Sequence, residues 1–151
     1  RWTGPPDSGT IQGDAKRITD SYQAVWEAGD FGALIDTHDR AYQGFAPGGE
    51  LLYGRDGLVN FLTGMRAAIA DTVYQVHHWI EQRENEKNSR IALRWSVSGP
   101  HSGNGHFGSP TGSPVVILAM SHLELQHGLV VREYHGIDEL SIWTQIAANK
   151  G

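Results

Sequence analysis

Residues Arg90–Ser98, with the sequence RIALRWSVS, decide the fold of this chain. Ile91, Leu93, Trp95 and Val97 alternate there with small or polar residues, so that apolar side chains recur at every second position. A period of two is typical of a β-strand that buries one face and exposes the other. We therefore predict a strand here, with Trp95 on the buried face.

Further strands are expected on both sides of this one. Residues 72–83 are rich in β-forming residues and precede it. After a glycine-rich connection at 99–113, residues 114–126 and 129–135 are expected to form two more strands, joined by a tight turn at His127-Gly128. The second half of the chain is thus predicted to be an antiparallel meander of long strands.

The first half of the chain has the spacing of helices instead. Apolar residues within 18–26 fall on one helical face, and Asp14 and Gly29 are suited to begin and end that helix. Gly54-Arg55-Asp56-Gly57 opens a further helix with its own apolar stripe. Between them, residues 42–53 are interpreted as irregular chain with one short strand or arm.

Helices followed by strands predict an α+β domain, in which the helices cover one face of an antiparallel sheet. A chain of 151 residues is long enough for one such domain with a sizeable core. We expect an extended arm at residues 1–13, a single domain over 14–147 and a short tail at 148–151.

The composition excludes several classes of protein. Twelve Lys and Arg against 17 Asp and Glu give a net charge of -5, whereas nonspecific nucleic-acid binding needs a basic surface. No apolar run approaches the ~20 residues of a membrane helix. The absence of cysteine excludes disulfides and thiolate metal sites and is compatible with a cytoplasmic protein. We therefore expect no nucleic acid and no membrane as partner.

Three segments, taken together, resemble a known family. They are Gly54-Arg55-Asp56-Gly57 at a helix start, Arg94-Trp95 followed by the glycine-rich residues 99–112, and residues 127–134 (HGLVVREY) with Asp138 and the closing 143–146 (WTQI). In this order and spacing, over most of residues 14–147, the chain resembles the SnoaL-like polyketide cyclases of the nuclear transport factor 2-like superfamily.

The resemblance implies a cone-shaped half-barrel of the nuclear transport factor 2-like or cystatin-like kind, in which a curved antiparallel sheet wraps around N-terminal helices. It also implies a deep pocket on the concave face and a homodimer formed through the convex face. In the characterised cyclases a carboxylate on the last strand acts as acid and base, and that position is His135 here. Asp138 matches a second acidic position, and a pocket histidine of the preceding strand is replaced by Ser121.

His135, Glu133 and Asp138 are the expected catalytic residues. Residues 133 and 135 of one strand point to the same face, and a histidine beside a carboxylate suits proton abstraction next to a carbonyl. The alternative is structural: Glu133 pairs with Arg94 or Arg132, His135 packs at a strand end, and Asp138 caps the last helix.

The expected ligand is a small apolar or aromatic molecule, because aromatic walls with few polar groups are typical of small-molecule sites. Aromatic residues at such spacing are also common in an ordinary core. The expected ligand-binding residues are Tyr22, Trp26, Tyr42, Trp95, Ser121 and His101.

His101 lies in the glycine-rich connection, which could be a lid over the pocket or could simply pack closely through its glycines. The pair His77-His78 would need further ligands to hold a metal, since neighbouring strand residues face opposite ways. We therefore expect neither a metal nor an organic cofactor.

Residues 114–120 are apolar on both faces of their strand, and Val116, Leu118 and Met120 are expected to point to the outer face of the sheet. An apolar outer face usually marks an interface, so we expect a homodimer through it. Two functions remain open: an enzyme for cyclisation, isomerisation or hydrolysis of a small carbonyl or lactone compound, and a non-catalytic ligand-binding or dimerisation module of the same fold. A peptide-binding adaptor ranks behind both.

Overall fold

The computed structural model describes residues 10–105 and 107–148. Most of the predicted arm (residues 1–9) and of the predicted tail (149–151) lies outside the described residues. The elements follow in the order α1 (Gly13–Gln23), η1 (Ala24–Ala28), η2 (Phe31–Asp36), β1 (His38–Phe45), η3 (Pro47–Gly49), β2 (Leu51–Tyr53), α2 (Gly54–Ala68), β3 (Val73–Arg83), β4 (Asn88–Pro100), β5 (Pro114–Gln126), β6 (Leu129–Ile137) and α3 (Glu139–Ala148).

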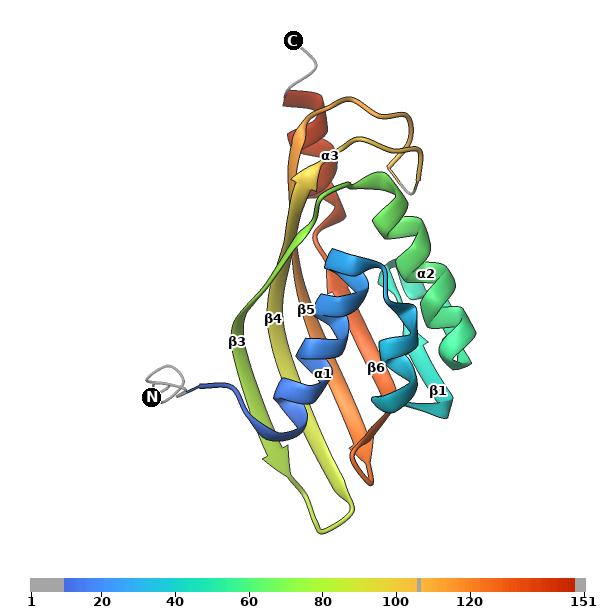
Figure 1. Ribbon diagram of the computed structural model, residues 1–151, viewed down its shortest axis with the longest axis vertical. Helices are drawn as coiled ribbons and strands as arrows, with labels where there is room; N and C mark the ends of the chain where they lie inside the picture. The colour runs from blue at the N-terminus through green and yellow to red at the C-terminus, as the bar shows by residue number, and fades with distance from the viewer. Residues whose placement is uncertain (1–9, 106, 149–151) are drawn as a thin grey trace.

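The fold is α+β, as predicted, with a curved six-stranded sheet in the order β2-β1-β6-β5-β4-β3. Figure 1 shows α1 and α2 on the same side of this sheet and α3 at one end of it. The strands β3 to β6 form the predicted antiparallel meander. At the other edge β1 runs parallel to β6, so the sheet is mixed, whereas the sequence predicted an antiparallel one.

The β1 strand was not predicted at its full length. Its inward positions are His38 and Tyr42, and Asp39, Arg40 and Gln43 lie between or beside them, so the segment has no apolar alternation. Its place in the sheet comes from pairing with β6, nearly 90 residues away, which local sequence does not encode. This pairing positions the site described below.

The alternation at 90–98 is confirmed. Ile91, Leu93, Trp95 and Val97 are buried in the core between the sheet and the helices, whereas Ala92 and Arg94 are exposed. The tight turn after β5 is also confirmed, since His127 and Gly128 both have positive φ, at 52° and 78°. Such a pair suits a two-residue hairpin turn.

The predicted helix caps have different outcomes. Asp14 lies inside the first turn of α1, where it pairs with Arg17, and the N-cap is Gln12. The helix continues through the π-helical turn η1 and ends at Gly29, which is left-handed with φ 69°. Asp138 does cap α3, because its Oδ1 accepts a hydrogen bond of 3.0 Å from the Ser141 N–H.

The glycine-rich connection packs against the end of α2. The backbone N–H groups of Ser102 and Gly103 donate to the Ala68 carbonyl, at 3.1 and 3.3 Å. A Cβ on Gly103 would collide with the Ala67 carbonyl, so only glycine fits there. This outcome agrees with close packing rather than with a lid.

Candidate functional site

A buried carboxylate, Glu133 on β6, is the centre of the candidate site. Its Oε1 accepts hydrogen bonds from the hydroxyls of Tyr22, at 2.5 Å, and Tyr42, at 2.9 Å. The Nε2 atoms of His135 and His38 lie 3.3 and 3.4 Å from the same oxygen. The Glu133 side chain is fully buried, so all these contacts are shielded from water.

Three elements bring these side chains together. Alternation along β6 puts Glu133 and His135 on the inner face of the sheet. The parallel pairing of β1 with β6 adds Tyr42 and His38, and α1 supplies Tyr22 from above the sheet. Gly44, opposite Glu133, has no side chain, and a Cβ there would lie 2.5 Å from the Tyr42 hydroxyl. The ring of Tyr42 can therefore fold back over Gly44 to reach the carboxylate.

The electrostatics of the cluster depend on the histidines. Burial by itself would raise the pKa of Glu133, but the charges and hydrogen bonds of His135 and His38 outweigh it and hold the pKa well below its usual range. Burial, followed by the charge of Glu133, raises the pKa of both Tyr22 and Tyr42. Both phenols thus keep their protons and act as donors to an ionised carboxylate.

The second oxygen of this carboxylate, Glu133 Oε2, is buried and has no hydrogen-bond partner among the described residues. Unsatisfied buried oxygens of a charged group are costly, and a native structure usually pairs them with a water or a ligand. Oε2 therefore lacks, among the described residues, the partner that a buried charged oxygen usually has.

His135 connects this cluster to the rest of the interior. Its Nε2 lies 3.2 Å from the Tyr42 hydroxyl, and its Nδ1 has no hydrogen-bond partner in the described parts of the chain. Ser121 is its neighbour across the β5–β6 pairing and accepts a hydrogen bond of 2.9 Å from Trp95 Nε1. The ring of Phe61, from α2, lies 5.8 Å from the ring of His135.

The interior next to this cluster is filled by aromatic rings. The ring centroids of Trp26 and Trp95 are 6.0 Å apart, and those of Tyr74 and Trp95 are 5.8 Å apart. All three side chains are buried. Among the expected ligand-binding residues, Tyr22, Trp26, Tyr42, Trp95 and Ser121 therefore do face the interior, and the ligand pocket itself stays a prediction.

Two predicted site residues lie elsewhere. His101 is a fully buried residue of the glycine-rich connection, and its Nδ1 is 2.9 Å from the Thr111 hydroxyl of the same connection. Asp138 is exposed beyond the end of β6 and faces the side of the sheet that the helices leave open. Asp138 therefore does not join Glu133 and His135, and of the two predicted carboxylates only Glu133 lies beside His135.

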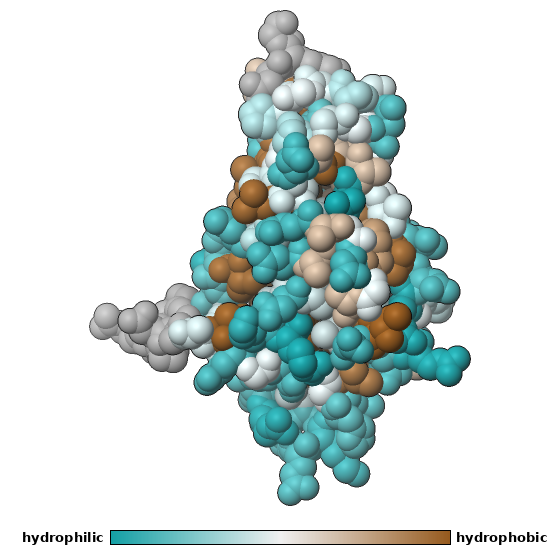
Figure 2. All heavy atoms as spheres, viewed as in Figure 1, coloured by the Kyte–Doolittle hydropathy of each residue, from teal (hydrophilic) through white to brown (hydrophobic). Residues whose placement is uncertain are grey.

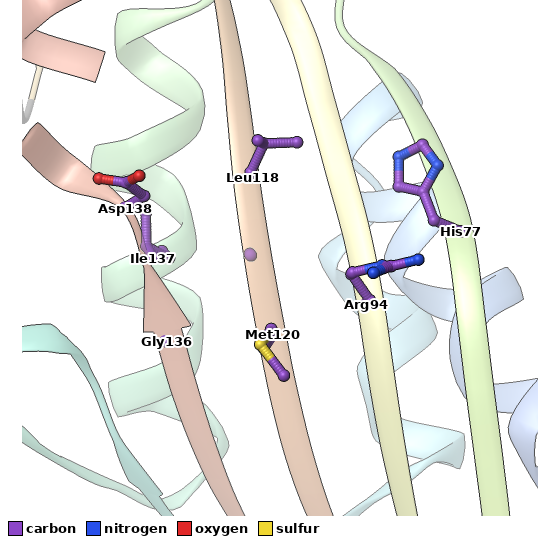
Figure 3. Close-up of a pocket in the computed structure, with 8 residues that line it drawn as sticks. His77, Arg94, Leu118, Met120, Gly136, Ile137 and Asp138 are labelled. Atoms are coloured by element: carbon purple, nitrogen blue, oxygen red, sulfur yellow. The ribbon is translucent and has the colours of Figure 1, made fainter. Parts of the chain in front are cut away.

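The outer face of the sheet carries a groove of about 720 Å³ that is lined by described residues. Figure 3 views this face, with Leu118 and Met120 from β5 between Arg94 and His77 on one side and Asp138 on the other. The helix side in Figure 2 differs, since hydrophilic residues predominate there and hydrophobic ones form separate spots.

His77 and His78 both lie away from the interior. The register shifts between Val76 and His78, so that a β-bulge at His77 places both histidines toward the outer face. Among the residues that the structure describes, no three His, Asp or Glu side chains form a group that could hold a metal ion. No described helix is long and apolar enough to cross a membrane.

His38 is the functional candidate that the sequence did not indicate. It follows Thr37 in a segment without apolar alternation, and nothing in its immediate sequence distinguishes it from the other seven histidines. Only the pairing of β1 with β6 brings it to Glu133.

Comparisons with known proteins agree with this architecture. TsrD from Streptomyces laurentii superposes with a TM-score of 0.74 at 17% identity, covering 92% of this chain and 98% of that one. IdmH from Streptomyces antibioticus, a candidate polyketide cyclase, gives 0.74 at 18% identity, with 90% and 99% covered. AclR from Streptomyces galilaeus, a candidate hydroxylase, gives 0.71 at 20% identity, with 90% and 83% covered.

These identities are low, so the solved structures support the fold alone. No curated protein matched the sequence. The sequence model of the SnoaL-like polyketide cyclases, in contrast, matches residues 16–146, which is most of the chain and includes every element of the candidate site. The chain belongs to the SnoaL-like polyketide cyclase family.

Proposed function

We propose that this chain is a cofactor-independent enzyme that moves a proton on a small, largely apolar carbonyl or lactone compound. The reaction would be a cyclisation, an isomerisation or a hydrolysis. The observation that carries the proposal is the buried Glu133–His135 pair, in which Glu133 Oε2 and His135 Nδ1 are both without partners among the described residues.

His135 is the proposed general base. In its neutral form it would take a proton from the carbon next to the carbonyl through Nδ1, leaving an enolate and an imidazolium. Glu133, 3.3 Å from Nε2, would stabilise the imidazolium, which later returns the proton to carbon or oxygen. The Ser121 hydroxyl accepts from Trp95 and so keeps its own proton for the enolate oxygen.

Phe61 lies at the proposed entrance for a ligand. One side of this half-buried ring lies near His135, and the residue also lines a surface cavity of about 490 Å³ between α2 and β2. Rotation of Phe61 would connect that cavity with the imidazole. A ligand of the proposed kind would then lie between Phe61 and the aromatic interior.

A general test is the exchange of α-protons for deuterium in a small aromatic ketone. We expect the protein to accelerate exchange in 2-tetralone, followed by proton NMR in D₂O. His135→Ala should reduce this rate by about 10²-fold or more, since a positioned general base contributes that much. His122→Ala is the matched control, because His122 is an exposed histidine on the outer face of the neighbouring strand β5. Undiminished exchange in His135→Ala would remove His135 from the mechanism.

The alternative is a non-catalytic ligand-binding or dimerisation module of the same fold. The observation in its favour is the packing of Trp26, Tyr74 and Trp95 against one another, which fills much of the interior with the protein's own rings. An exchange rate equal to that of buffer for a panel of ketones would favour this alternative.

We also propose a homodimer through the outer face of the sheet. Leu118 and Met120 are 54% and 66% exposed there, which is unusual for large apolar side chains that adjoin one another on a strand. Arg94 and Asp138 flank them on opposite sides of the groove. A two-fold axis through this patch would bring Arg94 of one copy toward Asp138 of the other, as an isologous interface requires.

Met120→Glu is expected to shift the protein from dimer to monomer. The substitution puts two like charges near the proposed axis, where both would lose water on association. Light scattering coupled to size exclusion measures the change. Ile35→Glu is the control, because Ile35 is 61% exposed but belongs to η2 on the helix side. A monomeric wild type, or a dimer unaffected by Met120→Glu, contradicts the proposal.

A further inference from the structure

Two polar atoms of the aromatic interior have no hydrogen-bond partner among the described residues. One is the acceptor Glu133 Oε2, and the other is the indole donor Trp26 Nε1. Their residues are 0% and 1% exposed. Buried donors and acceptors of native proteins are nearly always paired, because an unpaired one has lost its water without a replacement. Since one atom accepts and the other donates, a single molecule with one donor and one acceptor can satisfy both.

Trp26 and Glu133 belong to the same part of the interior. Tyr22, which is four residues before Trp26 on the continuous helix α1–η1, donates to Glu133 Oε1 at 2.5 Å. On the other side, the ring centroids of Trp26 and Trp95 are 6.0 Å apart. Burial, followed by the charge of Glu133, raises the pKa of Tyr74, whose ring centroid is 5.8 Å from that of Trp95. Neighbouring side chains therefore connect Trp26 with Glu133 on two sides.

The backbone of Trp26 is held by two other parts of the chain. Trp26 belongs to the π-helical turn η1, and its carbonyl accepts from Thr72 Oγ1, just before β3, and from Arg66 Nε of α2, the latter at 3.1 Å. Turns of this kind are rare and occur frequently at functional sites. The neighbouring indole differs, because Trp95 Nε1 donates to Ser121. An indole donor on a fixed backbone, with no partner in the described chain, is suited to bind a ligand oxygen.

The charge of the interior restricts the ligand further. Burial raises the pKa of Glu133, but the charges and hydrogen bonds of His135 and His38 outweigh it, so the carboxyl group is ionised at neutral pH. An ionised carboxylate only accepts hydrogen bonds. No Lys or Arg is among the buried residues that the structure describes, so a ligand carboxylate would meet the negative charge of Glu133 without a permanent cation to balance it. A hydroxyl group, in contrast, can donate to Glu133.

We propose that the interior binds an uncharged ligand with a hydroxyl group and a second oxygen, in which the hydroxyl donates to Glu133 Oε2 and the second oxygen accepts from Trp26 Nε1–H. This inference rests on the proposed function, because it assigns a substrate class, a hydroxylated ketone or lactone, to the same site. Both atoms are covered by neighbouring side chains in the structure, so the ligand replaces part of the aromatic packing. A hydrogen bond to an ionised acceptor is about twice as strong as a neutral one, so the hydroxyl contributes most of the selectivity.

The test is binding, measured by isothermal titration calorimetry with ketones of one skeleton. The probes are 2-tetralone, its isomers hydroxylated on the aromatic ring, and the matching methoxy and carboxy compounds. At least one hydroxy isomer is expected to bind about tenfold more tightly than its methoxy counterpart, which cannot donate a hydrogen bond. The carboxy compounds should bind more weakly than 2-tetralone itself. If no hydroxy isomer binds more tightly than its methoxy counterpart, the inference is overturned.

Trp26→Phe tests the contact with the second oxygen, since it removes the indole donor and keeps an aromatic ring. The variant should bind the best hydroxytetralone about fivefold more weakly. Its affinity for the matching hydroxytetralin, which lacks the ketone oxygen, should stay unchanged. Trp143→Phe is the control, because Trp143 is a 47% exposed indole on α3. Equal losses for the two ligands in Trp26→Phe would make Trp26 a packing residue and contradict its role as a donor.

Glu133→Gln tests the contact with the hydroxyl group. An amide both donates and accepts, so the preference for a hydroxy over a methoxy compound should fall to about unity. A preference that persists in the folded variant would place the hydroxyl elsewhere and overturn the assignment to Oε2. If Glu133→Gln does not fold, the comparison of hydroxy with methoxy probes in the wild-type protein still decides whether the ligand class is correct.

Failure of this inference can be distinguished from failure of the proposed function, because binding and proton exchange are measured separately. Hydroxyl-selective binding in a protein that does not accelerate α-proton exchange keeps the ligand class and rejects catalysis. Accelerated exchange without any preference for a hydroxyl group keeps catalysis and rejects the ligand class.

Discussion

Glu133→Ala is expected to lower the free energy of unfolding by about 3–5 kcal/mol, as is typical when one partner of a buried ion pair is removed. The two histidines and two tyrosine hydroxyls that now contact Oε1 would lose their common acceptor inside the protein. Urea denaturation at pH 7 measures the change. Glu124→Ala is the matched control, because that glutamate pairs with Arg132 at the surface of the neighbouring strand and should cost about 1 kcal/mol or less. Equal losses in the two variants would contradict the central role of Glu133.

The same residue predicts how stability depends on pH. The pKa of Glu133 is depressed in the folded protein relative to its ordinary value of 4.5. Its stabilising contribution is thus fully present above pH 4.5 and is lost as the pH falls through the folded-state pKa. Within that window Glu133 alone should make the free energy of unfolding fall by about 1.4 kcal/mol per pH unit.

Carbon-13 NMR of the side-chain carboxyl groups tests this direction directly. Glu133 should remain ionised below pH 4.5, the value from which its pKa is lowered. Glu81 provides an internal contrast, because burial and the nearby Asp14 raise its pKa. A Glu133 signal that titrates above that of Glu81 would mean that burial, and not the histidines, controls the carboxylate.

The strands that sequence predicted well are those whose partners follow directly along the chain. The predicted strand at 114–126 has the observed bounds, because its apolar run and the His127-Gly128 turn mark it locally. The pair Glu133 and His135 was found for the same reason, since two residues apart on a strand means one face. These features depend only on residues that are close to one another in the sequence.

What sequence did not predict depends on distant pairing. His38 reaches Glu133 through a parallel strand pair that crosses most of the chain, and its own segment is polar. Asp138 was grouped with His135 because it matches an acidic position of the resembled family, yet it lies beyond the end of β6 and faces the outer groove. The β1–β6 pairing was not available in the local sequence.

Trp95→Ala is expected to cost about 3–5 kcal/mol of unfolding free energy, the usual range when a large aromatic core residue is truncated. Trp95 packs against Trp26 and Tyr74 and donates to Ser121, so the substitution removes buried area and a hydrogen bond together. Trp143→Ala is the control. Trp143 lies on α3 and is 47% exposed, so its truncation should lower the free energy of unfolding clearly less. A loss below that of the control would mean that Trp95 is not part of a packed interior.

The cavity left by Trp95→Ala also distinguishes a filled interior from a ligand chamber. Indole should bind in the space vacated and raise the melting temperature of the variant, because a ligand that binds only the folded state stabilises it in proportion to the logarithm of its concentration. If the wild-type rings fill the interior completely, indole leaves the wild-type melting temperature unchanged. A rise in the wild type as well would require a space beside Ser121 and His135 that already accepts an aromatic molecule, and loss of that rise in Ser121→Leu would place the molecule next to the proposed base.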